Sequence, residues 1–192
     1  MGKAPPHLIA EFRAKGITIS KFDAARSQLS TAIGLWFADS DPVSIHALAY
    51  AAYEIVHAVS KKRDRFRRDL LFDTLVIKDE YRKEFNLFVK QHANFFKHAD
   101  RDVDVAIEFR PILSELFMLF TIVGIQLCGE RPNDAESAFL MWLYFHRPEL
   151  LTEKGREQFV QGIPVDQVDD IRAVPKSEFF QIIQSARAMR ER

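Results

Sequence analysis

The residues whose types best suit chemistry gather in one short segment, residues 91–102, which reads QHANFFKHADRD. Asn94 and His98 are four positions apart, so they share one face if this segment is helical. An imidazole titrates near working pH, and a polar pair at the end of a rigid helix is well placed to act on a ligand. Lys97 and Arg101 flank the histidine. The same residues also suit a helix C-terminus, where His98 and Lys97 would cap the last carbonyl groups.

A second candidate is the basic segment 60–69, SKKRDRFRRD. It carries six cations against two carboxylates, and the cations are Lys61, Lys62, Arg63, Arg65, Arg67 and Arg68. Such a run could hold a phosphate backbone, and Phe66 within it could stack on a base. The alternative is a solvated helix end whose cations suit the helix dipole.

Four ring-bearing residues form a third pattern, at offsets of 0, 4, 7 and 11 along one predicted helix. They are His46, Tyr50, Tyr53 and His57. This spacing places them on one stripe beside the apolar stripe of the same helix. We predict that they form the wall of a cleft or an interface with a partner. The alternative is a helix boundary whose aromatic side chains reach toward water.

Other kinds of site find little support. Glu54 and His57 form one Glu-x-x-His unit, but di-iron bundles use two such units and the chain has no second copy. The calcium-loop, phosphate-loop, dinucleotide and paired-cysteine patterns are absent. His92 is expected to be a core histidine, hydrogen bonded to a carbonyl or carboxylate. We therefore predict neither a metal site nor a cofactor.

The elements that must position these residues are helices. The spacing of apolar residues predicts helices over about 20–38, 41–59, 79–99, 111–128, 133–146 and 177–192. Residues 1–19 are expected to form an N-terminal arm and residues 147–176 an irregular connection. The third helix has the clearest stripe, formed by Tyr81, Phe85, Phe88, His92, Phe95 and Ala99.

Local signals define the ends of these helices. Ser20 with Asp23, and Asn133 with Glu136, have the spacing of capping boxes. The dipeptide Asp41-Pro42 gives an N-cap followed by proline at the first helical position. Gly129 is expected to close the fourth helix.

Length and composition agree with a helical bundle. The 192 residues suffice for one domain, and 47% apolar with 28% charged residues is the mixture of a globular protein rather than a disordered one. Seven glycines and eight prolines are few, whereas phenylalanine is abundant, with 17 copies. We predict a single all-α domain over residues 1–192, a bundle of about five to seven helices.

Charge and hydropathy bear on whether the protein is attracted to nucleic acid or to a membrane, and on its location in the cell. The 27 basic residues balance the 27 acidic ones, so any attraction to nucleic acid must be local. Residues 112–128 are the most membrane-like stretch, but they include Glu115 and Gln126 and fall short of the roughly 20 apolar residues of a membrane span. Secretory and lipidation signals are missing, and Cys128 is the single cysteine. We expect a cytoplasmic protein without a membrane partner.

The run NFFKHA, near the end of a middle helix, resembles the HEPN superfamily of small helical bundles, which occur in toxin–antitoxin, phage-defence and RNA-processing systems. Their signature is an arginine, a polar residue, three to five further residues and a histidine. Asn94 matches the polar position and His98 the histidine, whereas Ala93 stands at the arginine position. The resemblance implies metal-independent action on RNA, in which His98 handles protons at the ribose 2′-hydroxyl group and an arginine steadies the phosphate. Arg101, or an arginine within 63–68, is the candidate replacement.

Two hypotheses follow. The first is a HEPN-like protein that binds RNA or a nucleotide, with Asn94, His98 and Arg101 as a degenerate ribonuclease centre and residues 61–68 with Lys97 as phosphate contacts. The second is a non-catalytic, homodimeric interaction module that binds a protein partner through the His46–His57 stripe or the last helix. The substitution of the signature arginine leaves open whether the chain is an enzyme. The resemblance also implies a homodimer in the first case.

Overall fold

The structure is a computed structural model, and it describes residues 16–63, 82–97, 104–150, 153, 157 and 164–190. The described residues form seven α-helices and one short 3-10 helix, with no strand among them. The all-α prediction is therefore confirmed. The helices are α2 (Lys21–Phe37), α3 (Pro42–Arg63), α4 (Arg82–Lys97), α5 (Ile112–Leu127), α6 (Asp134–His146), η2 (Pro148–Leu150), α8 (Val165–Ala173) and α9 (Lys176–Arg190).

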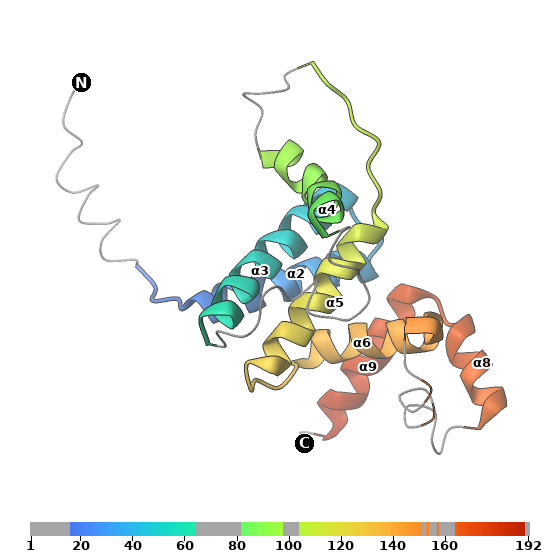
Figure 1. The fold of residues 1–192 in the computed structure, drawn as a ribbon. Coiled ribbons are helices and arrows are strands. Elements are labelled where there is room, and N and C mark those ends of the chain that lie inside the picture. Colours follow the sequence, from blue (N-terminus) through green and yellow to red (C-terminus); the bar gives the residue numbers. More distant parts are fainter. Residues whose placement is uncertain are drawn as a thin grey trace, which may run out of the picture.

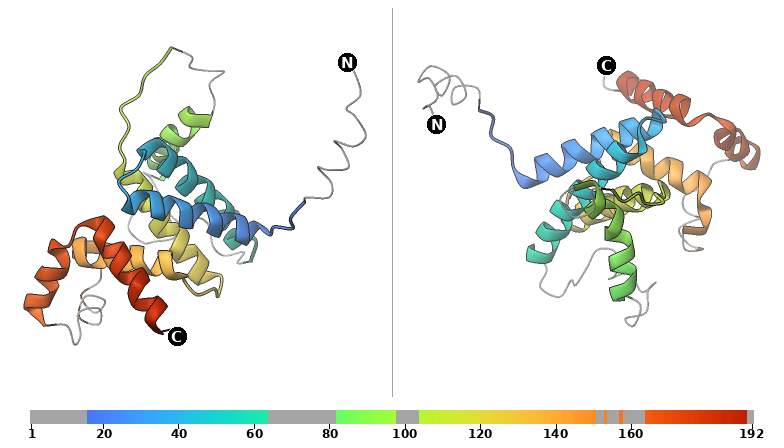
Figure 2. Two further views of the ribbon diagram at one scale, coloured as in Figure 1. Left: turned by 180° about the vertical axis from the view of Figure 1, so that it is seen from behind. Right: turned by 90° about the horizontal axis from the view of Figure 1, so that it is seen from above.

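Helix α3 occupies the middle of the arrangement, between α2 and α5 (Figure 1). Helices α2 and α3 form a hairpin, and α5 runs in the same general direction as α3, because Ser114 lies beside His46 and Cys128 beside Arg63. Helix α4 packs on α3. Helices α6, α8 and α9 form a second group that joins the first through α2 and α5 (Figure 2).

Both predicted capping boxes are present. The Ser20 hydroxyl oxygen accepts from the Asp23 backbone N–H at 3.1 Å, and the Asp23 carboxylate accepts from the Ser20 backbone N–H at 3.0 Å. Asn133 and Glu136 make the same exchange at the start of α6, with both distances 2.9 Å. These side chains satisfy N–H groups that the first helical turn leaves without partners, and so they fix where each helix begins.

Two other predicted boundaries are also found. Pro42 is the first residue of α3, and the Asp41 carboxylate accepts from the Ser44 backbone N–H at 2.7 Å. Gly129 follows α5 with φ of +86°, a left-handed conformation that glycine adopts without steric cost. Helix α3 continues to Arg63, beyond the predicted end near Val59, so the first cations of the basic run belong to its last turn.

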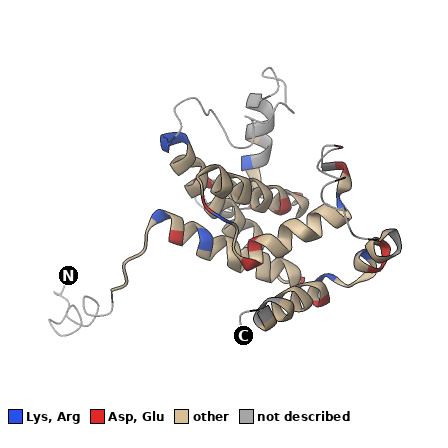
Figure 3. Ribbon diagram, turned by 90° about the horizontal axis from the view of Figure 1, so that it is seen from below, with Lys and Arg blue, Asp and Glu red and all other residues tan. Residues whose placement is uncertain are grey.

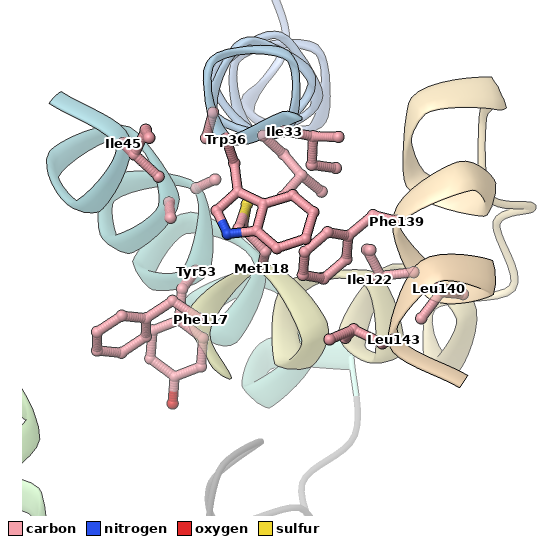
Figure 4. Close-up of a cluster of buried hydrophobic side chains, with 14 of the residues drawn as sticks. Ile33, Trp36, Ile45, Tyr53, Phe117, Met118, Ile122, Phe139, Leu140 and Leu143 are labelled. Atoms are coloured by element: carbon pink, nitrogen blue, oxygen red, sulfur yellow. The ribbon is translucent and has the colours of Figure 1, made fainter. Parts of the chain in front are cut away.

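The core lies where α2, α3, α5 and α6 meet, and most of it is aliphatic or aromatic. Trp36 stands edge-on to Phe139, with 5.1 Å between the ring centroids (Figure 4). Phe37 extends this cluster toward α9, because its ring stacks on Phe180 at 4.4 Å. Figure 4 labels a central set of these buried residues, which comprises Ile33, Trp36, Ile45, Tyr53, Phe117, Met118, Ile122, Phe139, Leu140 and Leu143.

The connection at 147–176 is not irregular throughout, which corrects the prediction for this segment. It contains η2 and the nine-residue helix α8. Helix α8 is short and carries three aspartates, which weakens its periodicity in the sequence. It is held by tertiary contacts, because Val168 is buried in the core and Ile171 packs against it. Helix length alone would leave so short a helix marginal in water.

The described part of the N-terminal arm, residues 16–19, carries no helix and leads away from the bundle (Figures 1 and 2). Ile17 and Ile19 are exposed there. Residues 1–15 and 64–81 lie outside the described residues. Among the helices that the structure does describe, none combines the length and the apolar character that crossing a bilayer requires.

Candidate functional site

The end of α4 carries part of the predicted catalytic group. Asn94 is exposed on the last turns of this helix, whereas Ala93 beside it is buried. The prediction for His98 and Arg101 falls outside the described residues. The structure therefore places Asn94 on the surface, and its pairing with His98 stays a prediction.

The structure contradicts the prediction for the ring-bearing stripe on α3. We predicted that His46, Tyr50, Tyr53 and His57 would face a cleft or a partner, but His46 is 0% exposed and both tyrosines are 2% exposed. The reason is that α3 is covered on two sides: α2 packs on its apolar stripe, and α5 with α4 packs on the ring-bearing stripe. His57 alone of the four is half-buried.

His46 lies inside a cluster of rings that we call the aromatic box, formed by His46, His92, Phe96, Phe109 and Phe117. Measured from the His46 ring, the centroids of the other four lie 5.1 to 6.2 Å away. His46 Nδ1 is 3.1 Å from the Ser114 hydroxyl oxygen, and its Nε2 is buried without a hydrogen-bond partner among the described residues. Burial, with a smaller contribution from His92, lowers the pKa of His46 to about 4.

His92 is the core histidine that the sequence predicts. It is 3% exposed, and its Nε2 atom lies 2.9 Å from the Glu108 carbonyl oxygen. This contact ties α4 to the segment that leads into α5. The box thus joins α3, α4, the segment before α5 and α5 itself through packed rings, and its low solvent access suits packing rather than ligand chemistry.

Beside the box, α3 and α4 meet through a connected polar group. The Tyr50 hydroxyl donates to Glu54 Oε1 at 2.9 Å, and Lys97 Nζ donates to Glu54 Oε2 at 3.1 Å. Lys97 Nζ also lies 4.5 Å from the centre of the Tyr50 ring. Burial and the bond to Glu54 raise the pKa of the Tyr50 hydroxyl group, so it stays protonated as a donor.

A hollow of about 270 Å³ follows the outer face of α3, next to the start of α2. We call it the α3 groove. Its apolar lining is Ile55, Ala58 and Val59 from α3. Glu54 lines one part of it, and Lys21 and Lys62 contribute ammonium groups. Lys61 is an exposed neighbour of Lys62 on the last turn of α3. Figure 3 shows this end of the helix in the colour of lysine and arginine.

Arg63 differs from its two lysine neighbours. Its guanidinium group donates to the Cys128 carbonyl oxygen at 3.1 Å and lies 5.0 Å from the centre of the Phe22 ring. Arg63 therefore joins the end of α3 to α2 and α5, and we do not count it among the free phosphate contacts. The remaining cations of the run, Arg65, Arg67 and Arg68, lie outside the described residues.

The Glu-x-x-His unit of α3 is occupied by other contacts. Glu54 binds Tyr50 and Lys97, and the Tyr53 hydroxyl lies 3.1 Å from His57 Nδ1. Within the described ranges, no group of three or more histidine, cysteine, aspartate and glutamate side chains is arranged to hold a metal ion.

Sequence reasoning missed two members of the α3 groove. Lys21 is the first residue of α2, and nothing in its local sequence indicates that the helix would begin beside the far end of α3. Glu54 matches a metal-ligand pattern in the sequence, but its spacing of four from Tyr50 is also a signal for the hydrogen bond that the two residues form.

Comparison of the chain with family models, with curated proteins and with solved structures finds no match in any of the three. The resemblance to the HEPN superfamily therefore rests on the segment NFFKHA and on the helical character of the chain.

Proposed function

We propose that this chain binds RNA or a nucleotide at the α3 groove, with Lys21, Lys61 and Lys62 as phosphate contacts. The observation that carries the proposal is that an apolar floor and exposed lysines occur at one place. Ammonium groups attract phosphates, and an apolar surface can take the face of a base. Neither property is specific by itself, but their combination matches an anionic ligand with a flat apolar part.

The position of α4 supports the same site. Lys97 reaches across to Glu54, so the end of α4 is joined to one of the residues that line the groove. Asn94 is exposed one turn earlier on α4, and its amide could donate to a phosphate or a base. Because Glu54 offsets the charge of Lys97, we assign Lys97 a smaller part in phosphate attraction than Lys61 or Lys62.

Cleavage of the bound RNA is the further step that the HEPN resemblance implies. It would use His98 to move protons, with Asn94 and Arg101 beside it. The structure describes only Asn94 of these three residues, so catalysis stays a prediction. Defence or toxin–antitoxin roles, which the resemblance also suggests, depend on that step.

The test is the binding of a fluorescently labelled single-stranded RNA, measured by anisotropy as a function of salt. Reversing one charge in Lys62→Glu should weaken binding about tenfold at low salt and reduce the slope of log affinity against log salt by about 1. The matched control is Arg110→Glu, because Arg110 is an exposed cation at the other end of α5 from the Lys61–Arg63 turn. RNA recovered from the same mixtures in a metal chelator reports cleavage, with His98→Ala as its control.

Equal losses in Lys62→Glu and Arg110→Glu would mean that attraction is not local to the groove, and the proposal would fail. Undetectable binding by the unaltered chain at low salt would also overturn it. That result would favour the second hypothesis, a non-catalytic interaction module, and light scattering would then measure whether the chain is a homodimer.

A further inference from the structure

A second hollow, which we call the α5–α6 hollow, lies between these two helices beside η2. Its volume is about 220 Å³, and it shares no residue with the α3 groove. The walls are aliphatic, formed by Ile112, Leu116, Leu119 and Leu143, and the charged lining residues are Glu115, Arg147 and the exposed Glu149 of η2. The first three of these residues, with Glu115, follow one face of α5 at helical spacing. Glu115 is thus the polar residue in an otherwise apolar face.

The carboxyl group of Glu115 is poorly accessible to water. Burial raises the pKa of Glu115, while the positive charge of Arg147, the indole N–H of Trp36 and the positive charge of Lys176 act in the opposite direction and favour the ionised form. A carboxylate in this position is short of solvation, and an ammonium group placed against it would restore a charged partner.

Arg147 supplies the opposite charge at the same hollow. It follows the end of α6 and is exposed, and its charge reaches Glu115. Among the described residues, however, no ion pair within 4.0 Å joins the two groups. The hollow therefore presents the Glu115 carboxylate and the Arg147 guanidinium group without a direct ion pair between them, and the second carboxylate, Glu149, is exposed at its η2 edge.

We propose that the α5–α6 hollow binds a small aliphatic α-amino acid. Its ammonium group would pair with Glu115, its carboxylate with Arg147, and its side chain would lie against the leucine and isoleucine walls. The volume is below the roughly 300–1,000 Å³ of pockets for drug-sized ligands, so the ligand must be small. A plain amine would bring no carboxylate to Arg147, and a plain acid would bring no ammonium group to Glu115.

The first experiment is calorimetric titration of the full chain with L-leucine, with two truncated probes for comparison. Isoamylamine lacks the carboxylate and 4-methylpentanoate lacks the ammonium group. We expect L-leucine to bind with a dissociation constant of about 1 mM or lower, and each truncated probe to bind at least about tenfold more weakly. Equal affinity of either truncated probe would overturn the proposal, as would no binding of L-leucine at about 10 mM.

The second experiment uses variants that keep the size of the hollow. Glu115→Gln and Arg147→Met should each weaken L-leucine binding about tenfold or more, because each leaves one ligand charge without a partner. Glu178→Gln removes an exposed carboxylate on α9 and is the matched control, with binding unchanged. Circular dichroism measures whether each variant is folded. If Glu115→Gln is unstable, Arg147→Met still tests the proposal, because Arg147 is exposed. Unchanged affinity in a folded variant of either residue would overturn the proposal.

Discussion

The aromatic box and the α3 groove both include residues of α3, but the His46 side chain is buried in the box and the charged side chains of the groove are exposed. In the box, the rings of α4, α5 and the segment before α5 enclose His46, and burial holds its pKa near 4. About four turns further along α3, Lys61 and Lys62 are exposed on the last turn of the helix. The box therefore keeps its polar atoms away from ligands, while the groove presents charges to solvent.

This difference shows that residue type is a weak guide to a site, and that the packing around the residue decides. A histidine that titrates near neutral pH in water stays neutral in the box and serves as a packed ring. The exposed lysines present their ammonium groups to solvent, where an incoming anion can reach them. The comparison predicts large effects on stability from changes in the box and small ones from changes at the groove.

Removal of Phe117 should have the largest effect. This ring is fully buried, and its centroid lies 5.0 to 5.4 Å from those of Tyr50, Tyr53 and His46. Phe117→Ala would leave a cavity in the middle of the α3–α5 contact and should lower the free energy of unfolding by about 3–5 kcal/mol. Urea denaturation followed by circular dichroism measures this change.

The matched control for Phe117→Ala is Leu127→Ala on the same helix. Leu127 is 52% exposed, so its loss should change the free energy of unfolding by less than about 0.5 kcal/mol. A similar small change for Phe117→Ala would show that the box tolerates a void, and the contrast between the two regions would no longer hold.

The second prediction concerns acid. His46 binds a proton in the unfolded chain at its ordinary pKa near 6.5, but the folded protein resists it until the pH approaches about 4. The unfolded state thus holds more protons between these values, so the contribution is complete above pH 6.5 and is lost as the pH falls toward 4. From pH 7 to pH 5, His46 should account for a loss of about 2 kcal/mol in the free energy of unfolding.

Urea denaturation at the two pH values, for the unaltered chain and for His46→Leu, isolates this contribution from that of other groups. The variant should lose about 2 kcal/mol less than the unaltered chain. If the variant does not fold, an NMR titration of the His46 ring gives the same answer, since the ring should stay neutral at pH 5. A ring that is protonated at pH 5 would contradict the enclosure that defines the box.

Much of the fold could be predicted from sequence because its determinants are local. Ser20 with Asp23 and Asn133 with Glu136 act within one turn, and both capping boxes form as expected. Helix α8 was missed because its stability comes from the burial of Val168 against other helices, which a nine-residue window does not reveal.

The candidate site could be predicted less well because it depends on which helices meet. The spacing of His46, Tyr50 and Tyr53 correctly indicates one stripe, but the sequence cannot show that α4 and α5 cover it. Likewise, Lys61 and Arg63 lie two positions apart in one basic run, yet only Arg63 is drawn to the Cys128 carbonyl group. Positions along a helix are rotated about its axis, so these two side chains point in different directions. Only Arg63 contacts the end of α5.

The smallest effect should come from the ion pair at the edge of the groove. Lys97 and Glu54 are 3.1 Å apart, but their side chains are 40% and 48% exposed. A double-mutant cycle with Lys97→Met and Glu54→Gln should give a coupling energy below about 1 kcal/mol, and added salt should reduce it. The nearby Tyr50 ring adds a cation–π contact that Lys97→Met removes in both arms of the cycle, so it does not enter the coupling. A coupling above about 2 kcal/mol that salt leaves unchanged is typical of a desolvated pair. It would mean that packing encloses this edge of the groove, as it encloses the box, and that an anionic ligand does not reach it.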